Sequence, residues 1–147
     1  MKRRKNFACC AARFGLGTLF LLGVLAAAAA TLTPRQMQEK YEKLAREAQT
    51  GYVASPARGE ELFRARRAHS KGDNIGCSTC HTEDPKSVGQ TRARKKIKPL
   101  APAANPERFT DTAQVEKWFT RNCDDVLERP CTPQEKADFI SFLLSVR

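Results

Sequence analysis

The chain has 147 residues, 41% of them hydrophobic, a composition that fits one globular domain. Its net charge of +10 falls to +5, from 21 basic and 16 acidic residues, once the first 30 positions are set aside. This mild charge, together with a single Trp and two Tyr, gives no support to nucleic-acid binding, so no such partner is expected.

Residues 1–30 have the pattern of a secretory signal peptide. A basic start without acidic residues precedes an uncharged run from residue 14 to residue 30, and small side chains at Ala28 to Ala30 suit a cleavage site. A retained membrane anchor is the alternative, because a run of 17 residues is at the lower limit for spanning a bilayer. We expect cleavage, a periplasmic protein, and contact with a membrane only if this segment is uncleaved.

The next segment, residues 31–50, is expected to hold one helix. Thr33 and Pro34 are typical of a helix start. Four apolar residues follow at three-to-four spacing: Met37, Tyr41, Leu44 and Ala48. The pattern predicts an amphipathic helix over residues 34–49.

Residues 51–147 are expected to form the main domain, which begins with a second helix. Ser55-Pro56 precedes this helix, and Leu62 and Phe63 belong to its buried side. We expect the helix to end around residues 68–72, where polar residues and glycine break the pattern.

A Cys-x-x-Cys-His motif, Cys77-Ser78-Thr79-Cys80-His81, follows this helix. Two thiols at this spacing lie on one turn of backbone and can add to the vinyl groups of a haem, while the next imidazole binds the iron. A zinc site would need a second Cys-x-x-Cys or a pair of spaced histidines, and the sequence has neither. We therefore expect one covalent haem c, attached to Cys77 and Cys80, with His81 as the proximal iron ligand.

The rest of the chain is expected to be a loop and two helices, with no strand, because no run alternates with period two. Residues 83–108 are rich in proline and predict a long irregular loop, which is typical of a segment that wraps a cofactor. Residues 110–112 precede a helix, and its expected single face is Val115, Trp118, Phe119 and Asn122. A capping box from Thr132 to Glu135 starts the last helix.

The second axial ligand of the iron is not supplied in the usual way. The only methionines are Met1 and Met37, and no His follows His81. We interpret His69, in a polar loop, as a solvated residue rather than a ligand. The remaining candidates are Asn122, Lys95, Lys96 and Lys98. Asn122 is the best placed, but the pattern equally allows an Asn that caps the end of its helix, and both interpretations stay open.

Cys123 and Cys131 are the two other thiols outside the signal segment, and export favours a disulfide between them. This bond would hold the backbone beside Asn122, or tie the last two helices together, or both. The basic cluster at residues 92–98 is interpreted as a solvated face, a counter-charge to the haem propionates, or a docking patch for an acidic redox partner.

Two resemblances extend these expectations. Gly59 and Phe63, with an aromatic-bearing terminal helix, resemble the crossed helices of class I cytochromes c. Most of the chain beyond residue 30 resembles the sphaeroides haem protein (SHP) family of mono-haem c-type cytochromes. The matching segments are Gly89-Gln90-Thr91-Arg92, Pro99-Leu100-Ala101-Pro102, Arg108-Phe109-Thr110-Asp111, Val115-Glu116-Lys117-Trp118, Arg121-Asn122-Cys123 and Cys131-Thr132-Pro133. An all-α, class I cytochrome c-like fold around one haem is therefore expected.

The SHP resemblance implies that Asn122 is the sixth ligand of the ferric haem and leaves the iron on reduction, so that the ferrous form binds O2 or NO. It also implies the Cys123–Cys131 disulfide and electron supply from a di-haem cytochrome c. A neutral amide oxygen is a hard donor that suits ferric better than ferrous iron, which agrees with this role. Residues 92–98 are more basic than the resemblance leads us to expect, so the partner surface does not follow from it.

Two other functions are alternatives to this gas-binding electron carrier. A plain electron-carrier cytochrome c would keep a fixed sixth ligand, such as a lysine amine, in both oxidation states. A small haem peroxidase or NO-detoxifying enzyme would need distal acid-base groups, and the sequence offers no distal His and no obvious Glu. We expect an electron-transfer and gas-binding protein rather than a dedicated enzyme.

Overall fold

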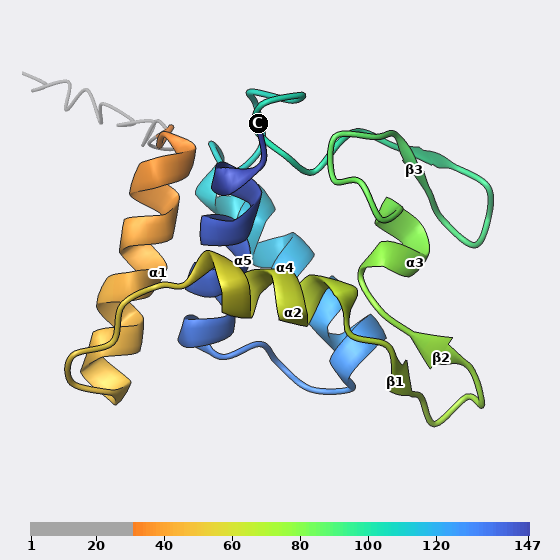
Figure 1. The fold of residues 1–147 in the computed structure, drawn as a ribbon, viewed down its shortest axis with the longest axis horizontal. Coiled ribbons are helices and arrows are strands. Elements are labelled where there is room, and N and C mark those ends of the chain that lie inside the picture. Colours follow the sequence, from red (N-terminus) through yellow and green to blue (C-terminus); the bar gives the residue numbers. More distant parts are fainter. Residues whose placement is uncertain (1–30) are drawn as a thin grey trace, which may run out of the picture.

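The computed structural model describes residues 31–147, so the expected signal peptide at residues 1–30 lies outside the described residues. Within this range the helices are α1 (Pro34–Ala48), α2 (Pro56–Arg64), α3 (Ser78–His81), α4 (Thr112–Leu127) and α5 (Pro133–Ser145) (Figure 1). Two short hairpins pair β1 (Arg67–Ala68) with β2 (Asn74–Ile75) and β3 (Gly89–Gln90) with β4 (Lys96–Ile97). The helical class is the one expected. None of the helices in this range is long and apolar enough to cross a membrane.

Helices α1, α4 and α5, the three longest, each begin at a residue whose side chain caps the helix. The Thr33 hydroxyl accepts a hydrogen bond from the Gln36 N–H (3.2 Å), and the Gln36 side chain accepts one from the Thr33 N–H (2.8 Å), which forms a capping box for α1. Thr132 and Glu135 form the same box at the start of α5. Asp111 caps α4. These local bonds explain why the helix starts could be predicted.

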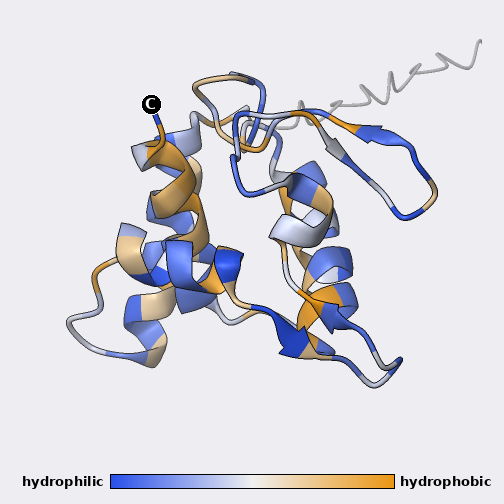
Figure 2. Ribbon diagram, turned by 45° about the vertical axis from the view of Figure 1, so that its right-hand side comes forward, coloured by the Kyte–Doolittle hydropathy of each residue, from blue (hydrophilic) through white to orange (hydrophobic). Residues whose placement is uncertain are grey.

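The core lies around α5, where α1, α2 and α4 meet it, and α5 is the most hydrophobic of these in Figure 2. Met37, Tyr41 and Ala45 form the buried face of α1, and the Tyr41 ring meets that of Phe119 on α4 edge to face at 5.5 Å. Leu44 was expected on this face, but it is 38% exposed. The buried apolar residues of α1 are spaced four residues apart, whereas Leu44 lies three residues after Tyr41 and falls beside that row.

Helices α2 and α5 cross in close contact at Gly59. A Cβ at this position would lie 2.0 Å from the carbonyl oxygen of Asp138 and 2.8 Å from the Cβ of Phe142. Beside this contact, the Phe63 ring of α2 packs on two rings of α5. Its centroid lies 6.4 Å from that of Phe139 and 5.5 Å from that of Phe142. The crossed arrangement expected from the class I resemblance is thereby confirmed (Figure 1).

A buried carboxylate fastens the loop before α2 to α5. Asp138 accepts hydrogen bonds from the Tyr52 hydroxyl (2.5 Å), the Ser55 N–H (2.6 Å) and the Arg58 guanidinium (2.8 Å). A buried charge is tolerated only when it is paired and hydrogen-bonded in this way. The network therefore sets where α2 begins.

Two expectations about secondary structure are wrong. The second helix ends at Arg64 rather than around residues 68–72, and the expectation of no strand fails because both hairpins contain strands. The β1–β2 hairpin turns at Gly72, whose φ of +91° suits glycine. Strands of two residues are too short to produce a period-two pattern, so nothing in the sequence could reveal them.

The contact at Gly59 predicts that Gly59→Ala lowers the free energy of unfolding by about 2–3 kcal/mol, because the added methyl group forces the two helices apart. Alanine has the better helix propensity by about 1 kcal/mol, so propensity alone predicts the opposite sign. Chemical denaturation of the haem-loaded protein measures the change.

The matched control is Ala57→Gly, at an exposed position of the same helix, which should lower stability by no more than about 1 kcal/mol. A Gly59→Ala variant as stable as the parent, or more stable, would show that α2 and α5 do not need this close approach.

Candidate haem site

The Cys-x-x-Cys-His motif forms a single helical turn. Cys77 already has helical backbone angles, and its carbonyl oxygen accepts the N–H of Cys80 (3.3 Å) and of His81 (3.1 Å). Residues three and four apart lie on one face of a helix, so the two thiols and the imidazole share a face. Both thiols are free and partly buried. Thr82, with a φ of +63°, ends the turn.

We call the turn formed by residues 77–81 the attachment turn. It packs against the β3–β4 hairpin at Gly89. A Cβ at Gly89 would lie 2.2 Å from the carbonyl oxygen of Cys80 and 3.1 Å from the Cα of His81. Only a residue without a side chain allows this approach. The hairpin therefore supports the attachment turn through its backbone at Cys80 and His81.

The surroundings of the motif keep its imidazole neutral. Burial, together with the smaller effect of the positive charge of Arg108, lowers the pKa of His81 to about 4. A neutral imidazole is the form that binds a metal. Burial also raises the pKa of Cys77 to about 11, so this thiol is protonated at neutral pH. Arg108 itself donates to the carbonyl oxygens of Pro99 (2.8 Å) and Lys98 (2.7 Å).

Helix α4 carries Asn122 on an exposed face. The buried side of α4 consists of Val115, Phe119 and Cys123. Trp118, at 43% exposure, and Asn122 form a neighbouring exposed strip, so the expected single face that combined them with Val115 and Phe119 is wrong. The helix buries every fourth residue from Val115, and that row does not include position 122.

The interpretation of Asn122 as a helix cap is also wrong. Helix α4 continues to Leu127, and its C-cap is Glu128 in a left-handed conformation. Asn122 thus lies inside the helix, five residues before its last one. No capping role explains this amide, and its role as an iron ligand stays a candidate.

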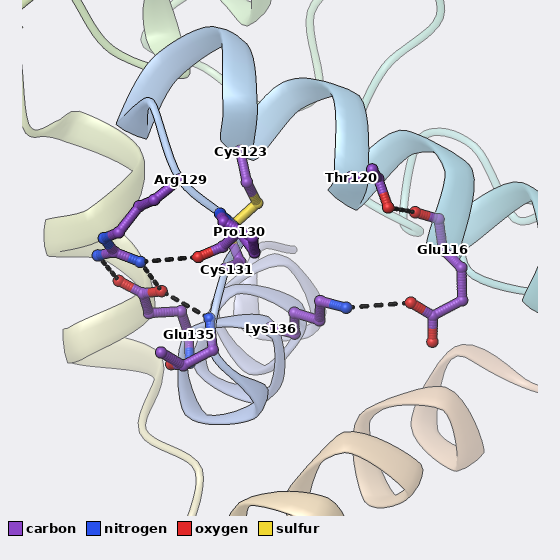
Figure 3. The surroundings of a disulfide bond; sticks show 9 residues. Glu116, Thr120, Cys123, Arg129, Pro130, Cys131, Glu135 and Lys136 are labelled. Carbon is purple, nitrogen blue, oxygen red and sulfur yellow. Dashed lines mark hydrogen bonds and ion pairs between the residues drawn. A yellow bond between two sulfur atoms is a disulfide. The ribbon is translucent and has the colours of Figure 1, made fainter.

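A disulfide joins Cys123 of α4 to Cys131, just ahead of α5 (Figure 3). An ion pair lies nearby, between the Lys136 ammonium on α5 and the Glu116 carboxylate on α4 (3.0 Å). Glu116 lies six residues before Asn122, and Cys123 directly follows Asn122. The backbone that carries Asn122 is therefore tied to α5 on both sides.

His69 is not the solvated loop residue expected. Its side chain is only 6% exposed, and its Nε2 faces the Glu128 carboxylate at 3.6 Å. Its Nδ1 accepts a hydrogen bond from the Lys71 N–H (3.1 Å). Glu128 also accepts the Ser70 N–H (3.1 Å), so the β1–β2 hairpin is attached to the end of α4. Both ring nitrogens of His69 thus face partners within the protein.

The lysines considered as iron ligands lie on the β3–β4 hairpin, away from the strip of α4 that carries Asn122. Lys95, Lys96 and Lys98 are all exposed. The Lys98 ammonium pairs with Glu107 at 3.3 Å. None of the three is buried near the Cys-x-x-Cys-His turn.

These residues fit a covalent haem. Two free thiols and a neutral imidazole on one face of a single turn are the donor set that attaches a haem and binds its iron from one side. The structure brings Cys77, Cys80 and His81 together on α3, and it brings Asn122 together with the disulfide on α4. Sequence reasoning missed Arg108 and Glu128, whose roles depend on partners distant in the chain.

Known proteins are similar to this chain in sequence and fold. A family model described as a domain of unknown function (DUF1924) matches residues 49–143. Cytochrome c-type protein SHP from Cereibacter sphaeroides is 46% identical over 127 residues, which cover 85% of this chain and 95% of that protein.

Solved structures agree with the sequence comparison. The structure of oxidised SHP, described as an oxygen-binding cytochrome c, has a TM-score of 0.69 at 46% identity and covers 77% of this chain and 96% of its own. A solution structure of cytochrome c'' from Methylophilus methylotrophus, described as an insight into haem-ligand detachment, has a TM-score of 0.68 at 38% identity, with coverage of 76% and 92%. The fold, the motif and this identity over most of both chains show that the chain belongs to the SHP family of mono-haem c-type cytochromes.

Proposed function

We propose that the protein is a periplasmic electron-transfer cytochrome in which Asn122 is the sixth ligand of the ferric iron, leaves it on reduction, and so admits O2 or NO. The observation that carries the proposal is that the usual axial donors within residues 31–147 are engaged elsewhere. Met37 is 0% exposed in the core of α1. The side chain of His69 is buried, with its Nδ1 hydrogen-bonded to the Lys71 N–H and its Nε2 facing Glu128. Asn122 is exposed on α4.

The relatives support this proposal by what they are described to do. SHP is described as an oxygen-binding cytochrome c. The description of cytochrome c'' refers to the detachment of a haem ligand. A detachable ligand and an oxygen site are the two halves of the function proposed for this chain.

The proposed roles follow from the chemistry of each side chain. Cys77 and Cys80 hold the haem by thioether bonds, and the neutral His81 binds the iron from one side. When bound, the haem supplies a redox-active iron with two axial positions. The amide oxygen of Asn122 is a hard, neutral donor, so it holds ferric iron better than ferrous iron. The oxidation state thereby shifts Asn122 between a bound and a free position.

The surroundings of Asn122 favour release by rotation of its side chain. The disulfide at Cys123 and the Glu116–Lys136 pair hold the backbone of α4 on α5. At the other end, Glu128 holds α4 to the β1–β2 hairpin. Unfolding of α4 would break all of these contacts, whereas a rotamer change breaks none of them.

The disulfide also supports the proposed location, because disulfides persist in oxidising compartments such as the periplasm. The electron donor that we propose is a di-haem cytochrome c, as the SHP resemblance implies.

The ligand role of Asn122 predicts opposite effects for two substitutions. Asn122→Ala should change the ferric haem spectrum to that of a haem with water in place of the amide oxygen. Asn122→His should make the haem low spin in both oxidation states and reduce carbon monoxide binding at least tenfold, because imidazole is a stronger ligand that remains bound to ferrous iron. Absorption and electron paramagnetic resonance spectra measure the spin state and ligation of the haem. Carbon monoxide titration measures whether a diatomic gas can bind the ferrous iron.

The matched control is Asp125→Ala, an exposed polar residue of the same helix, which should leave both spectra unchanged. If the ferric spectrum of Asn122→Ala equals that of the parent, another residue is the sixth ligand. A parent ferrous haem that is low spin and does not bind carbon monoxide would instead support the plain electron carrier.

Replacement of both Cys123 and Cys131 by serine tests whether the disulfide positions Asn122. The free energy of unfolding should fall by about 2.5 kcal/mol, because the loop between them is no longer closed. The ferric haem spectrum should also shift toward that of Asn122→Ala, since the backbone of α4 is less constrained. A loss of stability with an unchanged ferric spectrum would mean that the disulfide only ties two helices together.

A further inference from the structure

We propose that the β3–β4 hairpin and the hollow at its base form the docking surface for an acidic electron-transfer protein. The docked protein gives one electron to the ferric form of this protein, on the side of the molecule where Cys80 lies. We call residues 88–98 the basic hairpin. The proposal rests on the electron-transfer part of the proposed function. It is independent of which residue is the sixth ligand of the iron.

The basic hairpin concentrates positive charge. It contains no carboxylate and five exposed cations: Arg92, Arg94, Lys95, Lys96 and Lys98. Within residues 31–147 only Lys98 among them has a carboxylate partner, Glu107, and the two side chains are 74% and 81% exposed. An ion pair that is this exposed to solvent adds little stability. Figure 2 accordingly shows the hairpin as mostly hydrophilic.

The shape of the basic hairpin is set before any partner binds. Its strands pair antiparallel, and its tip is closed by hydrogen bonds from the Thr91 N–H to the Lys95 carbonyl (2.9 Å) and from the Arg94 N–H to the Thr91 carbonyl (2.8 Å). A segment that is already ordered loses less conformational entropy on binding. The cations are therefore presented from a fixed backbone.

The base of the hairpin lies at the attachment turn. Gly89 contacts the backbone of Cys80, and a hollow of about 420 Å³ opens between the hairpin and α3. Cys80, Thr82, Val88 and Arg92 are among the residues that line it. Val88 is 56% exposed in the hollow. Val88 thus offers an apolar contact within a lining that is otherwise mostly polar, and protein interfaces commonly combine both.

The chemistry of the surface favours an acidic protein over a membrane or a nucleic acid. Ala93 is the only apolar residue at the tip, so nothing there inserts into lipid. No aromatic side chain is present on the hairpin to stack on bases. Carboxylates on a protein partner match the fixed cations, and this complementarity speeds encounter at low salt.

The test compares two double charge reversals of the haem-loaded protein. Lys95→Glu with Lys96→Glu changes the basic hairpin. Arg35→Glu with Lys43→Glu changes the net charge equally at exposed positions of α1, on the opposite side of the molecule (Figure 1). The probe is oxidised flavodoxin, a small acidic electron-transfer protein. Affinity is measured at low and high salt, and carbodiimide cross-links to lysines are located by mass spectrometry.

We expect the hairpin variant to weaken flavodoxin binding at least tenfold at low salt and the α1 variant to weaken it less than threefold. Cross-links of the parent protein should fall on Lys95, Lys96 or Lys98, and binding should weaken with salt. The carbon monoxide spectrum of the hairpin variant should equal that of the parent, which separates a docking defect from a damaged haem site.

Three results would overturn the proposal. Equal weakening in both variants would mean that only net charge matters. Absence of flavodoxin binding by the parent would mean that the hairpin does not suit acidic redox proteins. Hairpin-dependent binding to phosphatidylglycerol vesicles, with flavodoxin binding unaffected by the hairpin variant, would identify a membrane surface as the partner instead.

Discussion

The contact of two backbones at Gly59 is the constraint on which the rest of the molecule depends. Where a Cβ would be, the carbonyl oxygen of Asp138 already lies, so α2 rests directly on α5. The buried Asp138 carboxylate holds the loop before α2 to the same helix. This one helix therefore fixes the entry, the direction and the depth of α2. The attachment turn begins 13 residues after α2 ends, and its position follows from that crossing.

The attachment turn and the proposed distal side of the haem site are held by different means. On the side of α3, local hydrogen bonds and the close approach of Gly89 fix the thiols and His81. On the side of α4, covalent and ionic links to α5 and to the β1–β2 hairpin fix the backbone around Asn122. Since that hairpin leads into the attachment turn, Glu128 connects the two sides. A backbone held in this way suits the switch proposed for the Asn122 side chain.

Ion pairing explains why a mildly basic protein has one strongly basic surface. Asp138, Glu116 and Glu135 pair with cations in and around the core. Carboxylates used in this way stabilise the fold and are not available to neutralise the β3–β4 hairpin. Four of its five cations have no carboxylate partner within residues 31–147. Unpaired positive charge therefore gathers on this hairpin, beside the attachment turn.

The helix starts and the attachment turn could be predicted because their causes are local. Thr33 with Gln36, and Thr132 with Glu135, are three residues apart, and the haem motif occupies a single turn. The end of the second helix could not be predicted, because the residues after Arg64 pair across a hairpin too short to have a period. The buried state of His69 depends on Glu128, which lies 59 residues further along the chain.

By itself, then, the sequence determined which residues can hold a haem, which helices form and where they begin, since these depend on neighbours within one turn. Only the tertiary structure decided which face of α4 is buried, that Asn122 lies inside that helix rather than at its end, and that the basic residues gather beside the attachment turn. Those features depend on how α4 packs on α5 and how the loop folds back onto Cys80. Contacts between distant segments leave no periodic signal in the chain, because they satisfy packing and hydrogen bonding only after the helices have met.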